Sequence, residues 1–510
     1  MQSPDLLLNA ATRFGERPCV IEGDRVLTFA EVDARADRLA GALLAGGLRR
    51  GDRVALLAGN VLEYLEVQVA TMRAGLILVP LNFRLAVPEL AYIVGDSRPR
   101  VLVHGPGHAE AAAALGVERT IHLGDAGTGE PYAEVLAQGE PWPAGTPRPR
   151  LDAEAANVIL YTSGTTGRPK GAVISNGALM ARLNMFAIEW GNRPGATFVQ
   201  ALPMFHIASH AAYSYTYVGA TIVMVPEFRP AGVLELISRV RATHVMLVPT
   251  MINMVLDEPT LADADLSHLE MILYGASAIP PEVLRRALAA FGCGFLQIYG
   301  MTETAASSLL RPADHDPDRF PERLASAGTD SLGTETRVVD GDDVEVPPGE
   351  LGEVVIRGPI VMDGYWNAPE ATAEALRGGW MHTGDIGYRS TDGYLYISDR
   401  LKDMIVSGAE NVYPREVEDV LYEHPAVADA AVIGVPDERW GERVHALVVT
   451  RAGVEVDLDA LLAHCRSRLA GYKVPKTAEL VDELPRNATG KVLRKDLRAR
   501  YWAGHDRHVN

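Results

Sequence analysis

The residues with the clearest chemical potential lie together in residues 161–171, directly after an apolar run typical of a buried strand. Glycines there let the backbone bend sharply and bring its N–H groups close to an anion. A Walker A loop is excluded, because Arg168 and Pro169 separate the second glycine from the lysine. The stretch suits an oligophosphate, and its alternative interpretation is a mobile surface loop. The residues concerned are Thr162, Ser163, Gly164, Thr165, Thr166, Gly167 and Lys170.

Two later segments each join an apolar strand to a turn, at residues 271–280 and 297–304. Small residues in the first turn leave room for a planar ring to lie against the backbone. A lone Thr-Glu dipeptide carries no information, but the whole Tyr-Gly-Met-Thr-Glu string of the second turn is distinctive. The turn residues are Gly275, Ala276, Ser277, Tyr299, Gly300, Met301, Thr302 and Glu303.

The last third of the chain adds two further charged candidates. Asp385 ends the string His-Thr-Gly-Asp, and an ionised carboxylate there can only accept hydrogen bonds. A turn aspartate that bonds its own backbone is the structural alternative. Lys491 ends the string Pro-Arg-Asn-Ala-Thr-Gly-Lys. An isolated lysine near a C-terminus is usually a solvated charge, so only the full string sets Lys491 apart.

Taken in order, these segments resemble the motifs of the adenylate-forming superfamily: acyl-CoA synthetases, peptide-synthetase adenylation domains and firefly-type luciferases. The resemblance spans roughly residues 20 to 500 and is greatest to an acyl- or aryl-CoA synthetase. It implies an AMP-forming ligase in which a carboxylate attacks the α-phosphorus of ATP and pyrophosphate leaves. The acyl group then passes to the thiol of coenzyme A. The implied cofactors are ATP, Mg2+ and coenzyme A.

The resemblance also implies a role for each motif. Tyr299 would stack on adenine, Thr302 would contact the α-phosphate, and Glu303 would hold Mg2+, a cation that prefers oxygen ligands. Asp385 would bind the ribose, and Lys491 would bridge the carboxylate and the α-phosphate. The expected catalytic residues are therefore Lys491, His206, Glu303 and Thr302, with Glu303 as the metal ligand.

A second group of roles concerns movement and coenzyme A. By resemblance, Asp399 is a hinge for the C-terminal domain, and segments 408–411, 437–442 and 471–476 contact coenzyme A. Relatives often carry Gly-Gly where this chain has Gly408 followed by alanine. Besides the loop and turn residues named above, the expected cofactor-binding residues are Asp385, Ile397, Arg400, Lys402, Gly408, Trp440 and Lys473.

The segment around His206 bears on the acid that is activated. A histidine here faces the acyl pocket in many relatives, although a lone histidine is more often half-buried core. Adenylation domains for α-amino acids carry an aspartate in this neighbourhood, whereas this chain has Phe205 and His206. We therefore expect a fatty or aromatic acid. Coenzyme A is the expected acceptor, with a carrier-protein thiol or another nucleophile as the alternative. An inactive nucleotide-sensing relative is a third interpretation.

Alternating strands and helices must position these residues. Thr28 and Glu31 form a capping-box pattern ahead of apolar residues at helical spacing. Repeated strand–helix–strand order predicts parallel sheets covered by helices, hence an α/β fold. By resemblance, residues 1–399 form a large domain of helix-covered sheets with a small barrel-like subdomain. Residues 400–510 form a small mobile α+β domain. The Gly- and Pro-rich stretch from roughly residue 125 to 149 is predicted to be a connection.

Composition narrows the remaining classes. The chain has 510 residues, 47% of them hydrophobic and 22% charged, which indicates a globular protein of several structural units. A net charge of −18 argues against broad nucleic-acid or anionic-membrane binding. Three scattered cysteines show neither metal-ligand nor disulfide spacing. No apolar run approaches the roughly 20 residues of a membrane span. We expect a cytoplasmic enzyme without a nucleic-acid partner, and a homodimer is one candidate assembly.

Overall fold

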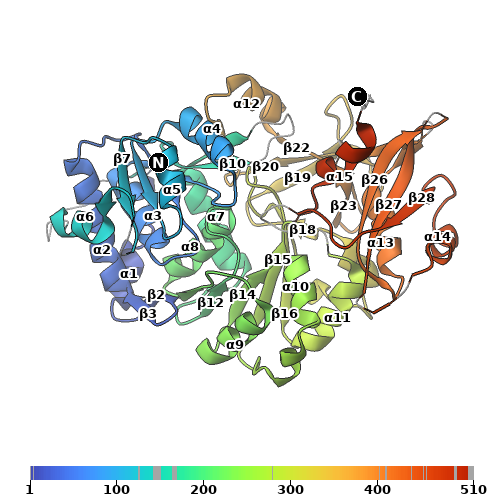
Figure 1. Cartoon of the computed structure of the whole chain (residues 1–510), viewed down its shortest axis with the longest axis horizontal. Coiled ribbons are helices and arrows are strands. Elements are labelled where there is room, and N and C mark those ends of the chain that lie inside the picture. The colour runs from blue at the N-terminus through green and yellow to red at the C-terminus, as the bar shows by residue number, and fades with distance from the viewer. Residues whose placement is uncertain are drawn as a thin grey trace.

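The fold is taken from a computed structural model of the chain (Figure 1). It describes residues 5–124, 127–141, 151–162, 169–277, 279–400, 403–407, 410–437, 439–451, 453–454, 456–486 and 491–503. Of residues 2–3 and 399–400 only the backbone is described. Near the N-terminus, β1 (Gln2–Ser3) pairs with β9 (Leu151–Asp152).

The first large sheet has eight strands in the order β21-β11-β10-β5-β4-β6-β7-β8. From β10 to β8 the strands run parallel, and β11 and β21 extend one edge in antiparallel fashion. The inner strands are almost continuously apolar and buried, as expected when helices cover both faces. The strands are β4 (Arg53–Leu57), β5 (Ile77–Pro80), β6 (Val101–His104), β7 (Arg119–His122), β8 (Glu130–Pro131), β10 (Ala156–Thr162), β11 (Lys170–Ser175) and β21 (Gly364–Tyr365).

The second large sheet has nine strands in the order β18-β17-β16-β15-β14-β12-β13-β2-β3. Strands β16 to β2 are parallel, and antiparallel strands lie at both edges. The strands are β2 (Pro18–Glu22), β3 (Arg25–Thr28), β12 (Thr197–Gln200), β13 (Thr221–Met224), β14 (His244–Leu247), β15 (Met271–Gly275), β16 (Gly294–Tyr299), β17 (Ser308–Leu310) and β18 (Thr329–Asp330).

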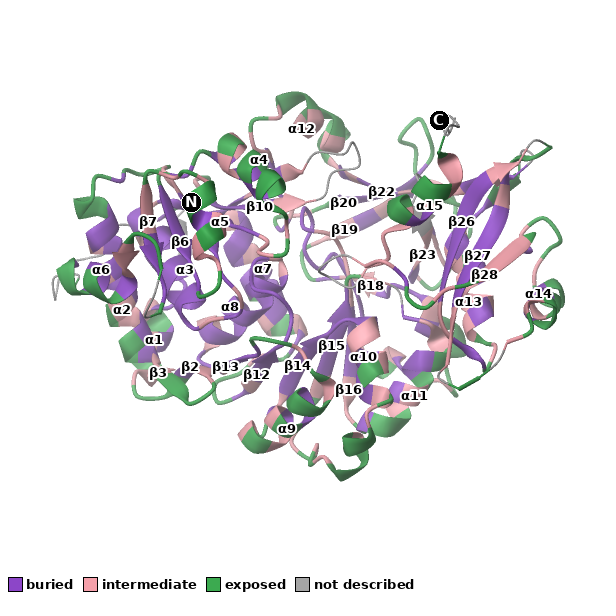
Figure 2. Cartoon of the chain, viewed as in Figure 1, coloured by how far each residue is buried: buried purple, intermediate pink, exposed green. Residues whose placement is uncertain are grey.

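A layer of helices lies between the two large sheets (Figure 1). Helix α2 begins after Thr28, whose side chain and that of Glu31 form the complete capping box that the sequence predicts. The buried side chains of this layer belong to the main apolar core, which Figure 2 shows as purple ribbon. The helices are α1 (Leu8–Phe14), α2 (Phe29–Ala45), α3 (Glu63–Ala74), α7 (Asn176–Glu189) and α8 (Ala208–Val218).

Other helices cover the outer faces of the two sheets. Helices α9 (Pro230–Val240), α10 (Pro249–Leu256) and α11 (Pro281–Phe291) pack on the second sheet, with η1 (Pro259–Asp263) beside them. Helices α4 (Val87–Ser97) and α5 (Ala109–Ala114) pack on the first sheet.

One prediction about this region is wrong. The stretch from roughly residue 125 to 149, expected only to connect elements, contains helix α6 (Tyr132–Gln138). Tyr132, Val135 and Leu136 have helical spacing and are buried, and α6 contacts α2. The glycines and prolines on both sides of this short segment hid the helical spacing of its apolar residues.

A smaller antiparallel sheet follows, in the order β19-β20-β22-β23. Its side chains form a separate apolar cluster, and it corresponds to the barrel-like subdomain expected beside the large sheets. The elements are β19 (Glu335–Val339), β20 (Gly352–Arg357), β22 (Met381–Arg389), β23 (Leu395–Arg400), α12 (Pro369–Ala375), and the short helices η2 (Pro312–Asp314), η3 (Pro321–Ala325) and η4 (Arg377–Gly379).

The C-terminal domain has its own sheet and apolar cores, at the right of Figure 1. The predicted fold class, a large N-terminal α/β domain with a separate small α+β domain, is confirmed. Among the described residues, no helix combines the length and apolar character needed to cross a membrane. The domain contains β24 (Ile405–Ser407), β25 (Glu410–Val412), β26 (Val427–Asp437), β27 (Gly441–Thr450), β28 (Thr477–Leu480), α13 (Pro414–Tyr422), α14 (Leu458–Arg466) and α15 (Arg494–Trp502).

Candidate active site

Two predicted nucleotide-binding segments meet where the second large sheet adjoins the four-stranded sheet. Tyr299 ends β16, and Asp385 lies in β22. The Tyr299 hydroxyl donates to Asp385 Oδ2 at 2.9 Å. The fold therefore brings together two side chains that are 86 positions apart in the chain, one expected to bind adenine and the other ribose.

The turn after β16 is closely packed. Gly300 has φ of +157°, and a Cβ at this position would lie 1.6 Å from the carbonyl oxygen of Ala305. Only glycine fits there. The Met301 N–H donates to Thr304 Oγ1 at 3.2 Å and stabilises the bend. The turn carries two predicted site residues that are nearly buried, Thr302 and Glu303.

Glu303 is held through both its backbone and its side chain. Its carbonyl oxygen accepts the Met362 N–H at 2.7 Å and Arg182 Nη2 at 3.3 Å. Its Oε1 accepts the Tyr365 hydroxyl at 2.9 Å. Burial lowers the pKa of the Arg182 guanidinium, and the nearby carboxylates of Glu303 and Asp363 oppose that shift.

The Glu303 carboxylate suits Mg2+ if a nucleotide supplies further oxygen ligands. Mg2+ in proteins is commonly held by one or two carboxylates together with substrate phosphates. Tyr365 engages one carboxylate oxygen, and among the described residues no hydrogen bond reaches the other, which could therefore bind a cation. Within the described part of the chain, no group of three or more His, Cys, Asp or Glu side chains could hold a metal by itself. A cation at Glu303 would therefore depend on phosphate oxygens.

Lys170 approaches the same position from the first large sheet. It begins β11, and its Nζ lies 5.1 Å from the centre of the Tyr365 ring. Across the β10–β11 hairpin, Thr162 Oγ1 donates to the Lys170 carbonyl at 3.4 Å. The predicted loop residues between them lie outside the described residues: Ser163, Gly164, Thr165, Thr166 and Gly167.

The turn after β15 has the backbone expected of a platform for a flat ring. A Cβ on Gly275 would lie 2.4 Å from the Ile298 carbonyl oxygen, so β15 and β16 approach closely there. Ala276 is exposed and has φ of +67°, a conformation that L-residues rarely adopt and that is often found at functional sites. Ser277 is half-buried beside it.

His206 immediately precedes α8. Its ring is partly accessible, yet protein atoms surround it densely, and this burial lowers its pKa to about 4. The ring is therefore neutral near pH 7. One turn later His210 is fully buried, and burial together with nearby Arg182 and His206 lowers its pKa.

The residues expected to contact coenzyme A are divided between two places. A cavity of about 660 Å3 lies between the two domains, and Lys473 helps to line it. Ile397, expected to bind a cofactor but not assigned to coenzyme A, lines it as well. Lys473 Nζ also pairs with Glu416 Oε1 at 2.6 Å. Trp440 is exposed, with the Arg439 guanidinium carbon 4.6 Å from its ring centre. Among described residues, Trp440 is not part of the cavity lining.

The remaining predicted residues lie on or near the C-terminal domain. Lys491 is half-buried and shortly precedes α15. The backbone of Arg400 is in register with Asp385 across β23 and β22. The predictions for Lys402 and Gly408 fall outside the described residues.

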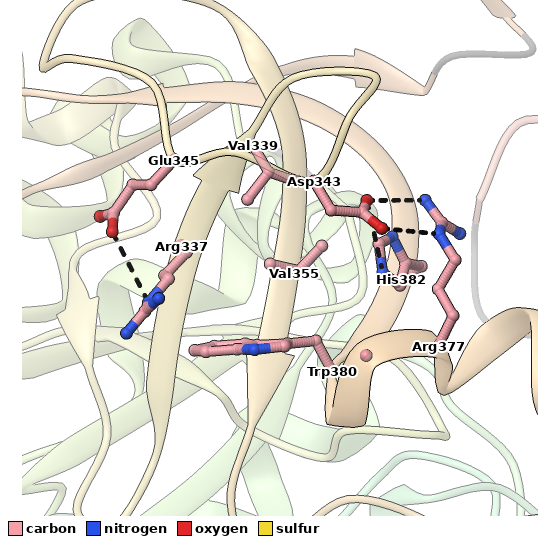
Figure 3. A pocket seen from close by; sticks show the side chains of 9 residues that line it. Arg337, Val339, Asp343, Glu345, Val355, Arg377, Trp380 and His382 are labelled. Atoms are coloured by element: carbon pink, nitrogen blue, oxygen red, sulfur yellow. Dashed lines mark hydrogen bonds and ion pairs between the residues drawn. The ribbon is translucent and has the colours of Figure 1, made fainter.

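A hollow of about 50 Å3 lies on the four-stranded sheet, and the charged and aromatic side chains that line it contact one another (Figure 3). Trp380 lies near two guanidinium groups, with the Arg337 and Arg357 carbons 4.6 and 4.4 Å from its ring centre. His382 lines the hollow, and its Nδ1 lies 2.9 Å from Glu353 Oε2. This histidine therefore stabilises the sheet, while the aspartate of the same motif reaches Tyr299.

Comparison with known proteins identifies the family. The AMP-binding enzyme profile matches residues 7–366, and the AMP-binding enzyme C-terminal domain profile matches residues 416–491. The chain belongs to the AMP-binding enzyme family. Family membership confirms the resemblance drawn from the motifs and makes the chain an adenylate-forming ligase by descent.

Three similar proteins match this chain over nearly its whole length. A feruloyl-CoA synthase of Amycolatopsis sp. is 43% identical over 485 residues, 94% of this chain and 95% of the relative. The fatty acid–[acyl-carrier-protein] ligase ScoC of Streptomyces coeruleorubidus is 38% identical over 506 residues, 97% of this chain and 95% of the relative. The structure of the amide bond synthetase McbA from Marinactinospora thermotolerans has a TM-score of 0.89 and 32% identity, covering 98% of this chain and all of that one.

Two residues of the site, Arg182 and Tyr365, were not predicted from the sequence. Arg182 lies in α7 at helical spacing from the buried Leu179 and beside the buried Leu183. A charged residue on an apolar helix face is a detectable signal, because burying it requires specific partners. Tyr365 lies in a two-residue strand and carries no comparable signal.

Proposed function

We propose that this chain is an ATP-dependent acyl-CoA synthetase that activates a fatty or aromatic acid. The observation that carries the proposal is the meeting of Tyr299 with Asp385 and of Glu303 with Lys170, through Tyr365, on neighbouring elements. These side chains supply four groups that suit the binding of ATP. They are an aromatic ring for adenine, a carboxylate for the ribose, a ligand for the cation and an ammonium group for the phosphates. The 43% identity to a feruloyl-CoA synthase supports coenzyme A as the acceptor.

The first step joins two anions, so alignment and charge neutralisation dominate its barrier. A carboxylate oxygen attacks the α-phosphorus, the bond from that phosphorus to the bridging oxygen breaks, and pyrophosphate leaves. Lys491 would bridge the two reacting groups, Thr302 would contact the α-phosphate, and Lys170 with the loop hydroxyls would hold the leaving phosphates. Mg2+ held by Glu303 would supply further neutralisation of phosphate charge.

In the second step the sulfur of coenzyme A attacks the acyl carbonyl carbon. The carbon–oxygen bond to AMP breaks, AMP leaves, and the thiol proton passes to solvent. Lys491 is needed only in the first step, which gives a reason for placing it on a domain that turns about Asp399. After the turn, residues 408–411 and Trp440 would serve coenzyme A. The protein needs no nucleophile of its own.

The side chains around His206 favour an acid without an ammonium group. Phe205, Ala208 and Ala211 are buried, and His206 is neutral near pH 7. An ammonium group buried there without a counter-charge would cost several kcal/mol. We therefore expect a fatty or aromatic acid to be activated at least about tenfold better than any α-amino acid.

Pyrophosphate release across a panel of fatty, aromatic and α-amino acids tests the first step. Coenzyme A is then added to the reaction with the best acid. It should be consumed while AMP and the thioester appear in equal amounts. A proteinogenic amino acid as best substrate would contradict the proposed acid class. Pyrophosphate release without any thioester would contradict coenzyme A as the acceptor.

A carrier-protein thiol or an amine is the second candidate acceptor. The observations that favour it are the relatives named as a fatty acid–[acyl-carrier-protein] ligase and an amide bond synthetase. Supplying the purified acyl adenylate with coenzyme A, with a phosphopantetheinylated carrier protein and with a primary amine in parallel separates the three acceptors, because the first step is then bypassed.

A further inference from the structure

Tyr365 lies between the two charged side chains that approach the expected phosphate position. Strand β21 pairs antiparallel with β11, with Tyr365 opposite Ala172. Side chains alternate along a strand, so Lys170, two residues before Ala172, is on the same face and diagonal to Tyr365. The Tyr365 hydroxyl donates to Glu303 Oε1 at 2.9 Å, while Lys170 Nζ lies 5.1 Å from the ring centre.

The backbone holds this tyrosine firmly despite the shortness of β21. The Trp366 N–H donates to the Gly171 carbonyl at 2.7 Å, and the Asp363 N–H donates to the Val173 carbonyl at 2.9 Å. The Asp363 carboxylate accepts the Ser175 N–H at 2.7 Å. Bonds on both sides of Tyr365 therefore fix its place along β11.

The chemistry of the contact makes Tyr365 a donor. A tyrosine hydroxyl can donate a hydrogen bond, whereas an ionised carboxylate can only accept one. The Tyr365 hydroxyl therefore keeps its proton and donates a hydrogen bond to the Glu303 carboxylate. Because a phenol is neutral, this bond orients the Glu303 carboxylate without cancelling its charge.

We propose that Tyr365 is a positioning residue that orients the Glu303 carboxylate toward a divalent cation and supports Lys170 beside the phosphates of ATP. The proposal rests on the proposed function, since it concerns the same nucleotide site. Groups that orient a metal ligand commonly alter metal affinity by about 10–100-fold when they are removed.

The chain offers a matched control for the hydroxyl. Tyr132 donates to Glu66 Oε2 at 2.7 Å in the N-terminal region, and both residues are buried. Tyr132→Phe removes a tyrosine–glutamate hydrogen bond of the same type away from the candidate site. Tyr365→Phe removes the hydroxyl and keeps the ring, whereas Tyr365→Leu removes both.

Mn2+ binding provides a readout that does not depend on turnover. The full-length protein is titrated with Mn2+ in the presence of a non-hydrolysable ATP analogue, and free Mn2+ is measured by electron paramagnetic resonance. Tyr365→Phe should weaken Mn2+ binding by about tenfold and raise the Mg2+ concentration for half-maximal pyrophosphate release in parallel. Tyr365→Leu should in addition raise the KM for ATP by about threefold, because Lys170 loses its aromatic contact.

Two results would overturn the proposal: unchanged Mn2+ affinity in Tyr365→Phe, or an equal loss of affinity in Tyr132→Phe. Thermal unfolding identifies a variant that does not fold, and Tyr365→Phe, which keeps the ring, carries the test if Tyr365→Leu fails. The proposed function is tested separately, because pyrophosphate release by the unaltered protein does not depend on any variant.

Discussion

The candidate site of the large domain and the region around α15 in the small domain use charged side chains in different ways. At the candidate site of the large domain, Glu303 accepts a phenol hydroxyl and Arg182 donates to two backbone carbonyls. Near Lys491 in the small domain, charged side chains meet opposite charges: Arg494 pairs with Glu418, and Arg498 pairs with Asp403.

The difference has a physical consequence. A carboxylate bonded to a neutral donor keeps its net charge and can act on a cation or a nucleotide that arrives later. An ion pair cancels both charges locally and restrains two backbone segments instead. The candidate site therefore keeps an uncancelled carboxylate charge at Glu303, whereas the cluster beside Lys491 uses charge to join α15 to α13 and to the segment that follows the expected hinge.

Lys491→Ala should produce the largest change, because it removes the charge that is expected to bridge the two reacting groups of the first step. Loss of a charge-stabilising group at the reacting atoms typically slows the step by on the order of 10²–10³-fold. Pyrophosphate release should fall by this amount, while thioester formation from a supplied acyl adenylate persists. Lys495→Ala, at an exposed position in α15, is the control. Equal loss in both half-reactions would show that Lys491 is not specific to the first.

Asp403→Asn should reveal the structural use of charge in the small domain. Asp403 and Arg498 are largely buried, with side-chain exposures of 7% and 12%, and Nη2 lies 2.6 Å from Oδ1. Breaking such a pair leaves a buried cation, so the free energy of unfolding should fall by about 3 kcal/mol. Since α15 follows Lys491 closely, pyrophosphate release should fall more than thioester formation.

An exposed ion pair provides the control for that experiment. Glu282 and Arg285 are 3.3 Å apart on α11, with side-chain exposures of 56% and 43%. Glu282→Gln should change the free energy of unfolding by less than about 1 kcal/mol. Denaturant unfolding measures the free energy of unfolding of both variants. Similar decreases in the two would contradict the distinction between the buried and the exposed ion pair.

The fold and the main motifs could be predicted because their determinants are local. The Thr28–Glu31 capping box, the apolar strands and the turn strings depend on residues close together in the chain. The hydrogen bond between Tyr299 and Asp385 was not predicted, but the resemblance assigned their two motifs to one ligand and so implied that they lie near each other. Tyr365 could not be found in this way, because its role depends on pairing between strands almost 200 residues apart, and pairing of that kind leaves no local pattern.

Arg415→Met tests how the two domains are joined in this orientation. From α13, Arg415 Nη1 donates to the Ile397 carbonyl at 2.9 Å, and Nη2 donates to the Ala325 carbonyl at 3.3 Å. Both acceptors belong to segments before the expected hinge, so these bonds favour the present orientation. Each is worth about 1 kcal/mol, and the loss of about 2 kcal/mol in total should change the ratio of the two half-reaction rates by about 30-fold.

The direction in which Arg415→Met changes the ratio of the two half-reaction rates shows which half-reaction the present domain orientation favours. Arg468→Met is the control, because Arg468 pairs with Glu423 within the small domain and is well exposed. An unchanged ratio in Arg415→Met would mean that Arg415 does not hold the domains in this orientation.

The smallest expected effect concerns His206, a site residue that the large domain keeps neutral. Burial lowers its pKa to about 4, below the usual value of 6.5. As the pH falls below 6.5 the unfolded chain takes up a proton that the folded ring resists, so stability is lost between pH 6.5 and pH 4. His206→Gln should remove this contribution, which amounts to about 1 kcal/mol or less at pH 6. The free energy of unfolding, measured as a function of pH for the unaltered protein and for His206→Gln, gives this contribution. A variant that loses stability as steeply as the unaltered protein would indicate that His206 becomes charged in the folded state, contrary to a site that presents a neutral ring to its acid.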